Sequence, residues 1–256
     1  MTRTSSLRQI GLARALSKLG YCSRSEAGDL IRAGRVHLNG RARRDPETPV
    51  HLEKDRIEVD GLAVAAVDKI YLMLNKPRGV VTTASDEKDR KTVYEFLNTV
   101  RTGKVLPWVA PVGRLDKASE GLLLLTNDSE WSARLLDPQT HLVKVYQVQI
   151  GKLADEKLFA SMLEGIQADD GDVLRVKAVR LVRSGQRNSW VEVVLDEGRN
   201  RHIRRLLDQL NVEVLRLIRT AIGPLVLGEL QKGSVRMLTL DEKKFLDRAA
   251  EKRSVD

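Results

Sequence analysis

Several features that would place a chain in a particular class are missing from this sequence. It has a single cysteine, Cys22, which excludes an intrachain disulfide and is typical of a reducing compartment. No stretch approaches the roughly 18 apolar residues of a membrane span, and Met1–Arg8 lacks the apolar core of a signal peptide. The histidines are scattered without the spacing of a metal site: His37, His51, His141 and His202. We therefore expect a soluble cytoplasmic protein without a structural metal.

Acidic residues are scarce relative to basic ones. The 256 residues include 44 Lys and Arg against 35 Asp and Glu, which gives a net charge of +9 and a pI near 9.7. This excess suggests a polyanionic partner, although ordinary solvated surfaces are also rich in lysine and arginine. The length suits one large or two ordinary domains, and the sequence has no internal repeat or low-complexity segment.

The first part of the chain has the pattern of a small α/β unit. Apolar residues at helical spacing over 12–19 are followed by Gly20, a residue type that commonly follows a helix C-terminus. Ser23 and Glu26 have the spacing of a capping box at the start of a second helix. Two dipeptides between short β-like stretches are typical hairpin turns: Asn39-Gly40 and Asp60-Gly61. We expect two helices and a few short strands.

The positive charge of this unit is concentrated. Between Leu7 and Arg44, nine basic residues are balanced only by Glu26 and Asp29, a net charge of +7 (9 − 2), which suits contact with a phosphate backbone. The unit also resembles the small RNA-binding domain of ribosomal protein S-four, some tRNA synthetases and many RNA-modifying enzymes. The matching positions are Ala15–Gly20, Ser23–Arg24, Ala27, Ile31, Gly34 and Val36–Gly40. RNA contacts are expected from Arg14, Lys18, Arg24 and Arg35.

From Asp68 onward, strand-like stretches are broken by turns and by few helices. Strand patterns occur at 70–74, 143–150 and 190–195, and helical spacing occurs at 158–163 and 203–210. Such an order favours an α+β fold. We expect three regions: a small N-terminal α/β RNA-binding domain over 7–67, a larger domain over 68–247 built on a mixed, mainly antiparallel sheet with flanking helices, and a charged tail over 248–256.

A short polar loop precedes the most apolar segment of the chain. Gly121–Thr126 contains four consecutive leucines, which is typical of a strand buried on both faces. Arg114 and Asp116 lie just before it, and loops held by a rigid, buried scaffold are where catalytic groups concentrate. The alternative is that Asp116 is an ordinary turn residue and Arg114 a solvated charge.

A second basic cluster, Glu197–Arg205, opens the last strong helical segment. Arg201 precedes Arg204 and Arg205 by one helical turn, so like charges share a face near a helix start, where positive charge is already unfavourable. An anion is expected to offset this repulsion, either RNA phosphate or a catalytic carboxylate. Arg204 and Asp208 are also spaced as an ordinary surface pair.

Together these segments resemble the pseudouridine synthases that modify ribosomal RNA, in the branch of the small-subunit enzyme and its large-subunit relatives. The resemblance covers nearly the whole chain and depends on several motifs in order behind the RNA-binding unit. They are Asn75–Val80, Gly113–Asp116 with Glu120–Thr126, Lys144–Tyr146, and Glu197–Arg205. One departure is Ala118, where the family usually has Thr or Ser; this small change leaves the carboxylate in place.

The resemblance implies that a uridine is converted to pseudouridine: the base–ribose bond breaks, the uracil rotates, and it rejoins through a carbon. It assigns the nucleophile or electrostatic stabiliser to Asp116, which Arg204 would keep ionised in a closed pocket. Tyr146 would stack on the uracil, and Arg114 would fill the space of the flipped base or grip nearby phosphates. Further RNA contacts are expected from Lys76, Arg78, Arg199, Arg201 and Arg205. The scheme needs no metal or cofactor.

Other interpretations fit parts of the sequence. A non-catalytic RNA-binding factor of ribosome assembly would keep the fold without the reaction, and Tyr146 is equally compatible with a half-buried strand residue. A nucleobase deaminase needs a zinc ligand set, which a single cysteine does not supply. Leu215–Arg219 favours a large-subunit hairpin as substrate, by resemblance alone. We expect a monomer that binds ribosomal RNA and no membrane.

Overall fold

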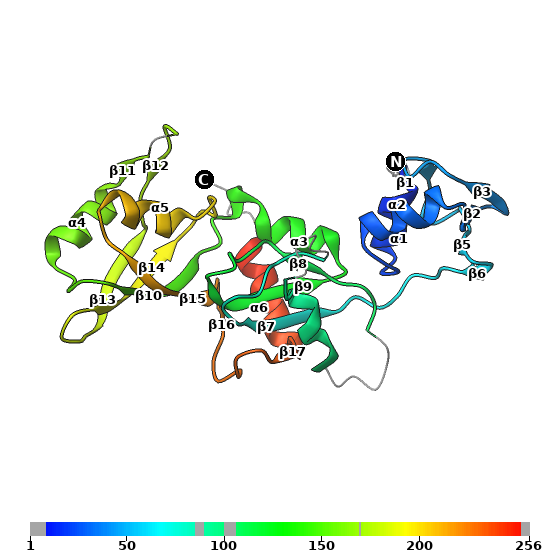
Figure 1. The fold of residues 1–256 in the computed structure, drawn as a ribbon. Coiled ribbons are helices and arrows are strands. Elements are labelled where there is room, and N and C mark those ends of the chain that lie inside the picture. Colours follow the sequence, from blue (N-terminus) through cyan, green and yellow to red (C-terminus); the bar gives the residue numbers. More distant parts are fainter. Residues whose placement is uncertain (1–8, 85–89, 100–105, 169, 252–256) are drawn as a thin grey trace, which may run out of the picture. The chain divides into compact units, whose positions relative to one another are not determined.

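The computed structural model describes residues 9–84, 90–99, 106–168 and 170–251 (Figure 1). The chain divides into two compact units. The first comprises residues 9–70 together with 106–110 and 126–129, and the second comprises the other described residues. Among the described residues, no helix has both the length and the apolar character needed to cross a membrane.

The first unit contains two helices and several short strands (Figure 1). The helices are α1 (Leu12–Lys18) and α2 (Arg24–Arg32). An antiparallel sheet has the order β3 (Arg41–Arg43), β2 (Val36–Leu38), β5 (Ile57–Val59) and β6 (Leu62–Ala63), and β1 (Ile10–Gly11) pairs with β4 (Pro49–Val50). Buried apolar side chains of both helices and of the sheet form one core, which includes Leu12, Leu16, Ala27, Ile31, Val36 and Val59.

Local sequence signals account for these elements. The Ser23 hydroxyl accepts a hydrogen bond from the Glu26 amide, and the Glu26 carboxylate accepts one from the Ser23 amide, so the predicted capping box is confirmed. Both predicted hairpin turns are also confirmed. Their central residues all have positive φ, as a type I′ turn requires: Asn39 (52°), Gly40 (77°), Asp60 (51°) and Gly61 (80°).

The second unit is built on a mixed sheet. Its described strands have the order β13–β14–β10–β15–β9–β7–β17, with β16 paired to β15 and β8 to β9. The bounds are β7 (Tyr71–Lys76), β8 (Ala110–Val112), β9 (Glu120–Thr126), β10 (Lys144–Ile150), β13 (Ala178–Ser184), β14 (Ser189–Leu195), β15 (Val214–Ile222), β16 (Leu225–Val226) and β17 (Val235–Met237). A separate hairpin pairs β11 (Ile166–Gln167) with β12 (Val173–Leu174).

The strand directions match the predicted fold class. Strand β10 is antiparallel to both β14 and β15, and β13 and β17 are antiparallel to their neighbours β14 and β7. Strands β15 and β9 run parallel. The prediction of an α+β protein with a small N-terminal domain and a larger domain on a mixed, mainly antiparallel sheet is confirmed.

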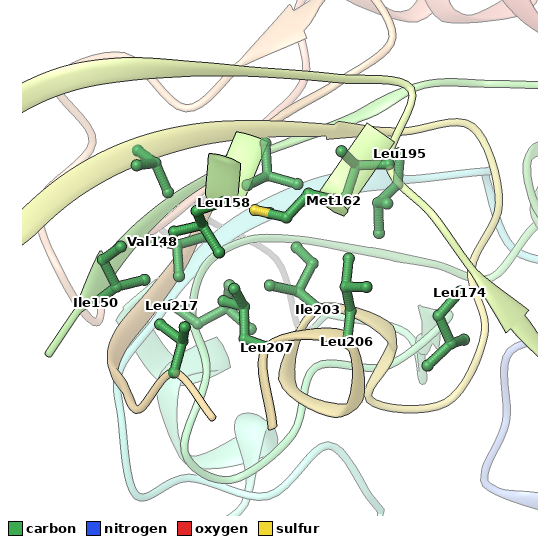
Figure 2. Packing of buried hydrophobic residues seen from close by; sticks show 14 of the residues in the cluster. Val148, Ile150, Leu158, Met162, Leu174, Leu195, Ile203, Leu206, Leu207 and Leu217 are labelled. Atoms are coloured by element: carbon green, nitrogen blue, oxygen red, sulfur yellow. The ribbon is translucent and has the colours of Figure 1, made fainter. Parts of the chain in front are cut away.

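Two helical layers pack on this sheet. Helices α4 (Glu156–Glu164) and α5 (His202–Gln209) share one core with β10, β14 and β15. Figure 2 shows Met162 of α4 and Ile203 of α5 within this core. Helices α3 (Ser129–Leu136) and α6 (Leu240–Ala250) pack in a second core with β7 and β9, and the Trp131 indole N–H donates to Asp247 at 2.8 Å. Short 3₁₀ helices span Val93–Thr99 and Pro138–Thr140.

Some elements were not located from the sequence pattern. Helices α3 and α6 and the mostly exposed edge strand β13 carry many polar residues, which weaken their periodicity. Helix α6 continues to Ala250, past the boundary placed at residue 247, because Leu246 and Ala250 are buried in the same core. Residues 7 and 8 of the predicted first domain, and 252–256 of the predicted tail, lie outside the described residues.

Gly121 allows β9 and β15 to approach each other closely. Its register partner in the parallel pair is Arg219, and its φ is +100°. A Cβ atom at residue 121 would lie 2.2 Å from the carbonyl oxygen and 2.8 Å from the amide nitrogen of Arg219, which is too close for any real side chain. Only glycine fits here, so Gly121 fixes the distance between β15 and the strand that follows the Asp116 loop.

Replacing Gly121 by alanine is therefore expected to lower the free energy of unfolding by about 2–4 kcal/mol, from backbone overlap and unfavourable φ together. Gly228→Ala is the matched control, since its φ is +58° and no atom lies within 4 Å of the added Cβ. The Gly228→Ala substitution should lower the free energy of unfolding by only about 1 kcal/mol. Urea denaturation followed by circular dichroism measures both values, and equal losses would contradict the close approach.

Candidate active site

The second unit contains a cleft of about 590 Å³ whose walls come from segments far apart in the sequence. They are the loop between β8 and β9, strands β10 and β15, and the loop before α5. The structure brings together five of the predicted site residues along this cleft: Arg114, Asp116, Tyr146, Arg199 and Arg201. An enclosure of this kind, with polar groups converging on it, is the expected form of a binding or catalytic site.

Asp116 lies in the loop between β8 and β9, with its side chain 32% exposed. The guanidinium of Arg201 is the partner of its carboxylate, with 3.7 Å between Arg201 Nη1 and Asp116 Oδ2. The pair brings opposite charges together at the edge of the cleft, and a carboxylate is a group that can serve in nucleophilic or electrostatic catalysis. The sequence had suggested that an anion offsets the clustered arginines, and Asp116 is one such anion.

The backbone of the Asp116 loop is fixed by hydrogen bonds to each of its carbonyl groups from 115 to 119. The Thr82 hydroxyl donates to Leu115 (2.8 Å), the Ser119 amide to Asp116 (2.9 Å) and the Gly79 amide to Lys117 (2.7 Å). The remaining two carbonyls, of Ala118 and Ser119, accept from Arg204 (3.1 Å) and from Lys76 (2.8 Å). The donors outside the loop come from two separate segments, 76–82 and α5, so the loop has little freedom to move.

Lys76 does not occupy the position expected of an RNA-binding residue. Its exposure is 0%, and its ammonium donates to the carbonyl groups of Pro77 (3.0 Å), Asp116 (3.2 Å) and Ser119 (2.8 Å). Burial lowers the pKa of Lys76 to about 8, although the charges of Asp116 and Glu120 act in the opposite direction. The expected RNA contact is wrong because β7 continues to Lys76 and carries this side chain into the interior.

Arg204 also differs from its expected role. Rather than forming an ion pair with Asp116, its Nη2 donates to the Ala118 carbonyl, and Arg201 takes the place next to the carboxylate. Burial and the neighbouring Arg201 hold the pKa of Arg204 below its ordinary value, and the charge of Asp116 opposes this. Arg201 is the N-cap of α5 with φ +50°. Its charge still repels that of Arg204, as the predicted clustering implied.

Tyr146 lies on β10 and lines the cleft as a half-buried side chain. Its register partners are Val193 on β14 and Arg219 on β15. The tyrosine thus stands on the floor of the cleft, while Arg114 lies in the wall as an exposed residue. A carboxylate, a guanidinium and an aromatic ring around one cleft suit the binding of a planar base attached to a phosphate backbone.

Comparison with known proteins assigns this geometry to a family. Residues 70–209, more than half of the chain, match the family model described as RNA pseudouridylate synthase. The chain belongs to this family. The model of the S4 domain matches residues 10–57, which lie in the first unit. The chain is thus a pseudouridine synthase, an isomerase that acts on RNA, and it carries an S4 domain as the resemblance in its sequence implied.

Individual relatives cover almost the whole of this pseudouridine synthase. An RNA pseudouridine synthase of Aquifex aeolicus is 38% identical over 235 residues, 91% of this chain and 92% of its own. Ribosomal large subunit pseudouridine synthase B of Bacillus subtilis is 34% identical over 236 residues, 92% of this chain and 94% of its own. A crystal structure of a pseudouridylate synthase has a TM-score of 0.62 at 30% identity, and covers 93% of this chain and 99% of its own.

Two arginines predicted to bind RNA in this pseudouridine synthase are held by acidic residues of the β11–β12 hairpin. Arg199 lies 2.7 Å from Asp172, and Arg205 contacts both Asp170 and Asp172. A hydrogen bond from Arg199 to Glu197 raises the pKa of Arg199 above its ordinary value. This pairing was not predictable from local sequence, because the hairpin lies about 30 residues before the arginines along the chain. Arg199 still lines the cleft.

The other predicted RNA-binding residues lie on the surface. Arg78 is exposed and donates to the Leu215 carbonyl at 3.3 Å. In the S4 domain, Arg14 and Arg24 are exposed and Lys18 is half-buried. Arg35 is exposed but forms an ion pair with Asp60. Among the described residues, no group of three or more His, Cys, Asp or Glu side chains is arranged to hold a metal ion.

Glu120 is a residue whose role the sequence did not reveal. It begins β9 only four positions after Asp116, its exposure is 3%, and its carboxylate accepts hydrogen bonds from Arg216 (3.1 Å) and Lys232 (2.5 Å). Burial alone would raise the pKa of Glu120, but these two partners outweigh it and hold the pKa below its ordinary value. These hydrogen bonds fasten the end of the Asp116 loop to β15 and to the segment before β17.

Replacing Lys76 by methionine tests whether this residue supports the structure or contacts the RNA. Lys76→Met leaves buried carbonyl groups unpaired, so we expect the free energy of unfolding to fall by about 2–4 kcal/mol and the rate of pseudouridine formation to fall with it. RNA affinity should stay within about twofold, since an interior lysine does not reach the RNA. Arg78→Met, on the surface, should instead weaken RNA binding at unchanged stability. Filter binding and urea denaturation distinguish the two patterns.

Glu120 should make stability depend on pH. Because its pKa is lower in the folded state than in the unfolded state, its contribution is complete above the unfolded value of about 4.3 and is lost as the pH falls below that value. Glu120→Gln is expected to cost about 1–3 kcal/mol at pH 7, and to flatten the decline of stability between about pH 5 and pH 3. The exposed Glu229 supplies the control, as Glu229→Gln should preserve the wild-type profile. Parallel profiles for wild type and Glu120→Gln would refute this role.

Proposed function

We propose that this pseudouridine synthase isomerises a specific uridine of ribosomal RNA, with Asp116 as the catalytic carboxylate. The observation that carries the assignment is the position of Asp116, in a cleft beside Arg201 and in a loop whose successive carbonyl groups are all hydrogen-bonded. A binding protein without catalysis has no use for a carboxylate in a surface that receives phosphates.

Ribosomal RNA, and a hairpin of the large subunit in particular, is the proposed substrate. The Bacillus subtilis relative with 34% identity is named for the large ribosomal subunit. The net charge of +9 and the S4 domain favour a structured RNA partner. Exposed Arg14 and Arg24 of the S4 domain and Arg78 of the second unit would contact its phosphates.

The target uridine must leave its stack before it can reach Asp116. A base within folded RNA is accessible to an enzyme only after it rotates out of the helix, at a cost of a few kcal/mol. Arg114 is exposed at the wall of the cleft, where its guanidinium would occupy the vacated space or bind the neighbouring phosphates. Cationic groups at this position offset part of that cost.

Asp116 would then stabilise or attack the reacting nucleotide as the base–ribose bond breaks. The Arg201 guanidinium lies beside the carboxylate, and Arg204 acts through the Ala118 carbonyl by holding the loop in place. Preorganisation matters here, because a displacement of about 1 Å in a reacting group costs on the order of 10²-fold in rate.

Tyr146 would stack on the uracil while the base turns. Its ring lies on the floor of the cleft, so a stacked base stays enclosed and water is excluded from the opened bond. The phenol is also suited to receive the proton that leaves the newly joined carbon. We place the enzyme in the cytoplasm as a monomer, since one chain supplies every wall of the cleft and the lone Cys22 suits a reducing compartment.

Replacing Asp116 by alanine tests the catalytic assignment. Asp116→Ala is expected to lower pseudouridine formation by more than about 10³-fold, because the group that stabilises the opened bond is removed. RNA affinity should remain within about twofold of wild type. Asp241→Ala, at a residue 79% exposed in its side chain and outside the cleft, should leave both properties unchanged.

The substrate is identified by mapping pseudouridines in both ribosomal RNAs from cells with and without this enzyme. One position in the large-subunit RNA should disappear when the gene is deleted and return with wild type but not with Asp116→Ala. Unchanged maps would refute ribosomal RNA as the substrate. Full restoration by Asp116→Ala would refute the catalytic role of the carboxylate and favour an assembly factor.

A further inference from the structure

Arg219 is a buried cation with one guanidinium nitrogen that makes no hydrogen bond to the described residues. It lies on β15, its exposure is 6%, and its Nε donates to the Leu122 carbonyl at 2.7 Å. Its Nη2 is buried and has no hydrogen-bond partner among the described residues. Leaving a buried charged donor unpaired costs about 1–3 kcal/mol or more, which suggests that this side chain is kept for a ligand. The residue lines the cleft.

Lys144 is a second cation that lines the same cleft. It is half-buried and forms no ion pair with any described carboxylate. Burial and the charge of Arg219 lower the pKa of Lys144, and only Asp196 acts in the opposite direction. Asp196 itself lies 3.7 Å from Lys177. Lys144 and Arg219 therefore repel each other, and no carboxylate of the described residues forms an ion pair with either.

Both cations lie next to Tyr146. Arg219 is its register partner on the neighbouring strand, and Lys144 precedes it by two positions on the same face of β10. All three side chains line one cleft with Asp116. A base stacked on Tyr146 would thus have its polar edge within reach of two donors, while its ribose is nearer the carboxylate loop.

We propose that Arg219 and Lys144 bind the oxygen atoms of the uracil and stabilise the negative charge that it carries after its bond to ribose breaks. This role rests on the proposed function. When the C1′–N1 bond breaks, its electron pair stays on the uracil, and Asp116 holds the ribose carbon. The C5–C1′ bond then forms from an electron pair of the base as the Asp116 carboxylate leaves C1′ with its own electron pair, N1 takes up a proton, and the proton on C5 leaves. No oxidant or reductant is needed.

The location favours the base over a phosphate as the ligand. Arg219 is almost fully buried on a strand, among apolar wall residues that include Leu124, Leu217 and Ile222, whereas phosphates meet exposed arginines such as Arg114. Donors fixed in apolar surroundings stabilise developing charge more strongly than solvated ones do. The pair therefore acts on the departing base and contributes to rate more than to RNA affinity.

Single-turnover rates at saturating RNA test this role. Lys144→Met and Arg219→Gln should each lower the rate by about 10²-fold, with the dissociation constant for RNA within about twofold of wild type. Lys144→Arg should restore most of the rate, and Lys152→Met, an exposed lysine outside the cleft, should have no effect. Should Arg219→Gln fail to fold, Lys144→Met still decides the outcome.

A second measurement reports on the charge of the base itself. RNA in which 5-fluorouridine replaces uridine has a better leaving group, because fluorine withdraws electrons from the ring. The loss of 5-fluorouridine from nuclease digests should therefore be slowed less by Lys144→Met than the reaction of uridine is. A variant with weaker RNA binding but a normal saturated rate would identify a phosphate site and overturn the assignment, as would equal slowing of both substrates.

Failure of the proposed function gives a different result. If the wild-type enzyme forms no pseudouridine in either ribosomal RNA, the substrate assignment and the role of these cations both fall. If wild type is active and Lys144→Met and Arg219→Gln, both folded, match its rate, only the role of the two cations is refuted.

Discussion

The site depends on the hydrogen bonds that Lys76 makes inside the protein. Its ammonium binds three carbonyl groups, two of which belong to the loop that carries Asp116. Lys76 ends β7 and Glu120 begins β9, and both of these charged side chains are buried. The Asp116 loop is therefore held by a buried cation from β7 and by a buried carboxylate at its own end. Buried charges of this kind add little net stability, but they specify one arrangement, and catalysis by a carboxylate needs one arrangement.

The distribution of charge around the cleft divides the arginines into classes. Arg201 is paired with the Asp116 carboxylate, and Arg199 and Arg205 are paired with acidic residues of the β11–β12 hairpin. Arg114 and Arg78 remain on the surface, where they are available to phosphates. The net charge of the whole chain is therefore a poor guide to the number of cations that contact the RNA. Several of the arginines instead form ion pairs that hold the walls of the cleft in place.

Much of this architecture follows from local sequence. Capping and turn residues located the helices and hairpins of the first unit, and the leucine run identified β9, because these signals act over a few residues. Contacts that depend on tertiary structure were not predictable. Strand β7 continues two residues past the predicted end at residue 74 and carries Lys76 into the interior. Arg201 rather than Arg204 lies next to the Asp116 carboxylate. Glu120 accepts hydrogen bonds from Arg216 and Lys232, which lie about one hundred positions later in the sequence.

The parallel pairing of β9 with β15 affects when the cleft can form during synthesis of the chain. The paired residues Glu120 of β9 and Ile218 of β15 are 98 positions apart (218 − 120). Because the chain must close so long a loop before these strands pair, the pairing is a slow, late event in folding. During translation, the Asp116 loop emerges well before the strand that completes its cleft. A nascent chain shorter than about Ile222 therefore carries Asp116 without the floor that β15 provides, and activity begins only after that strand has left the ribosome and docked.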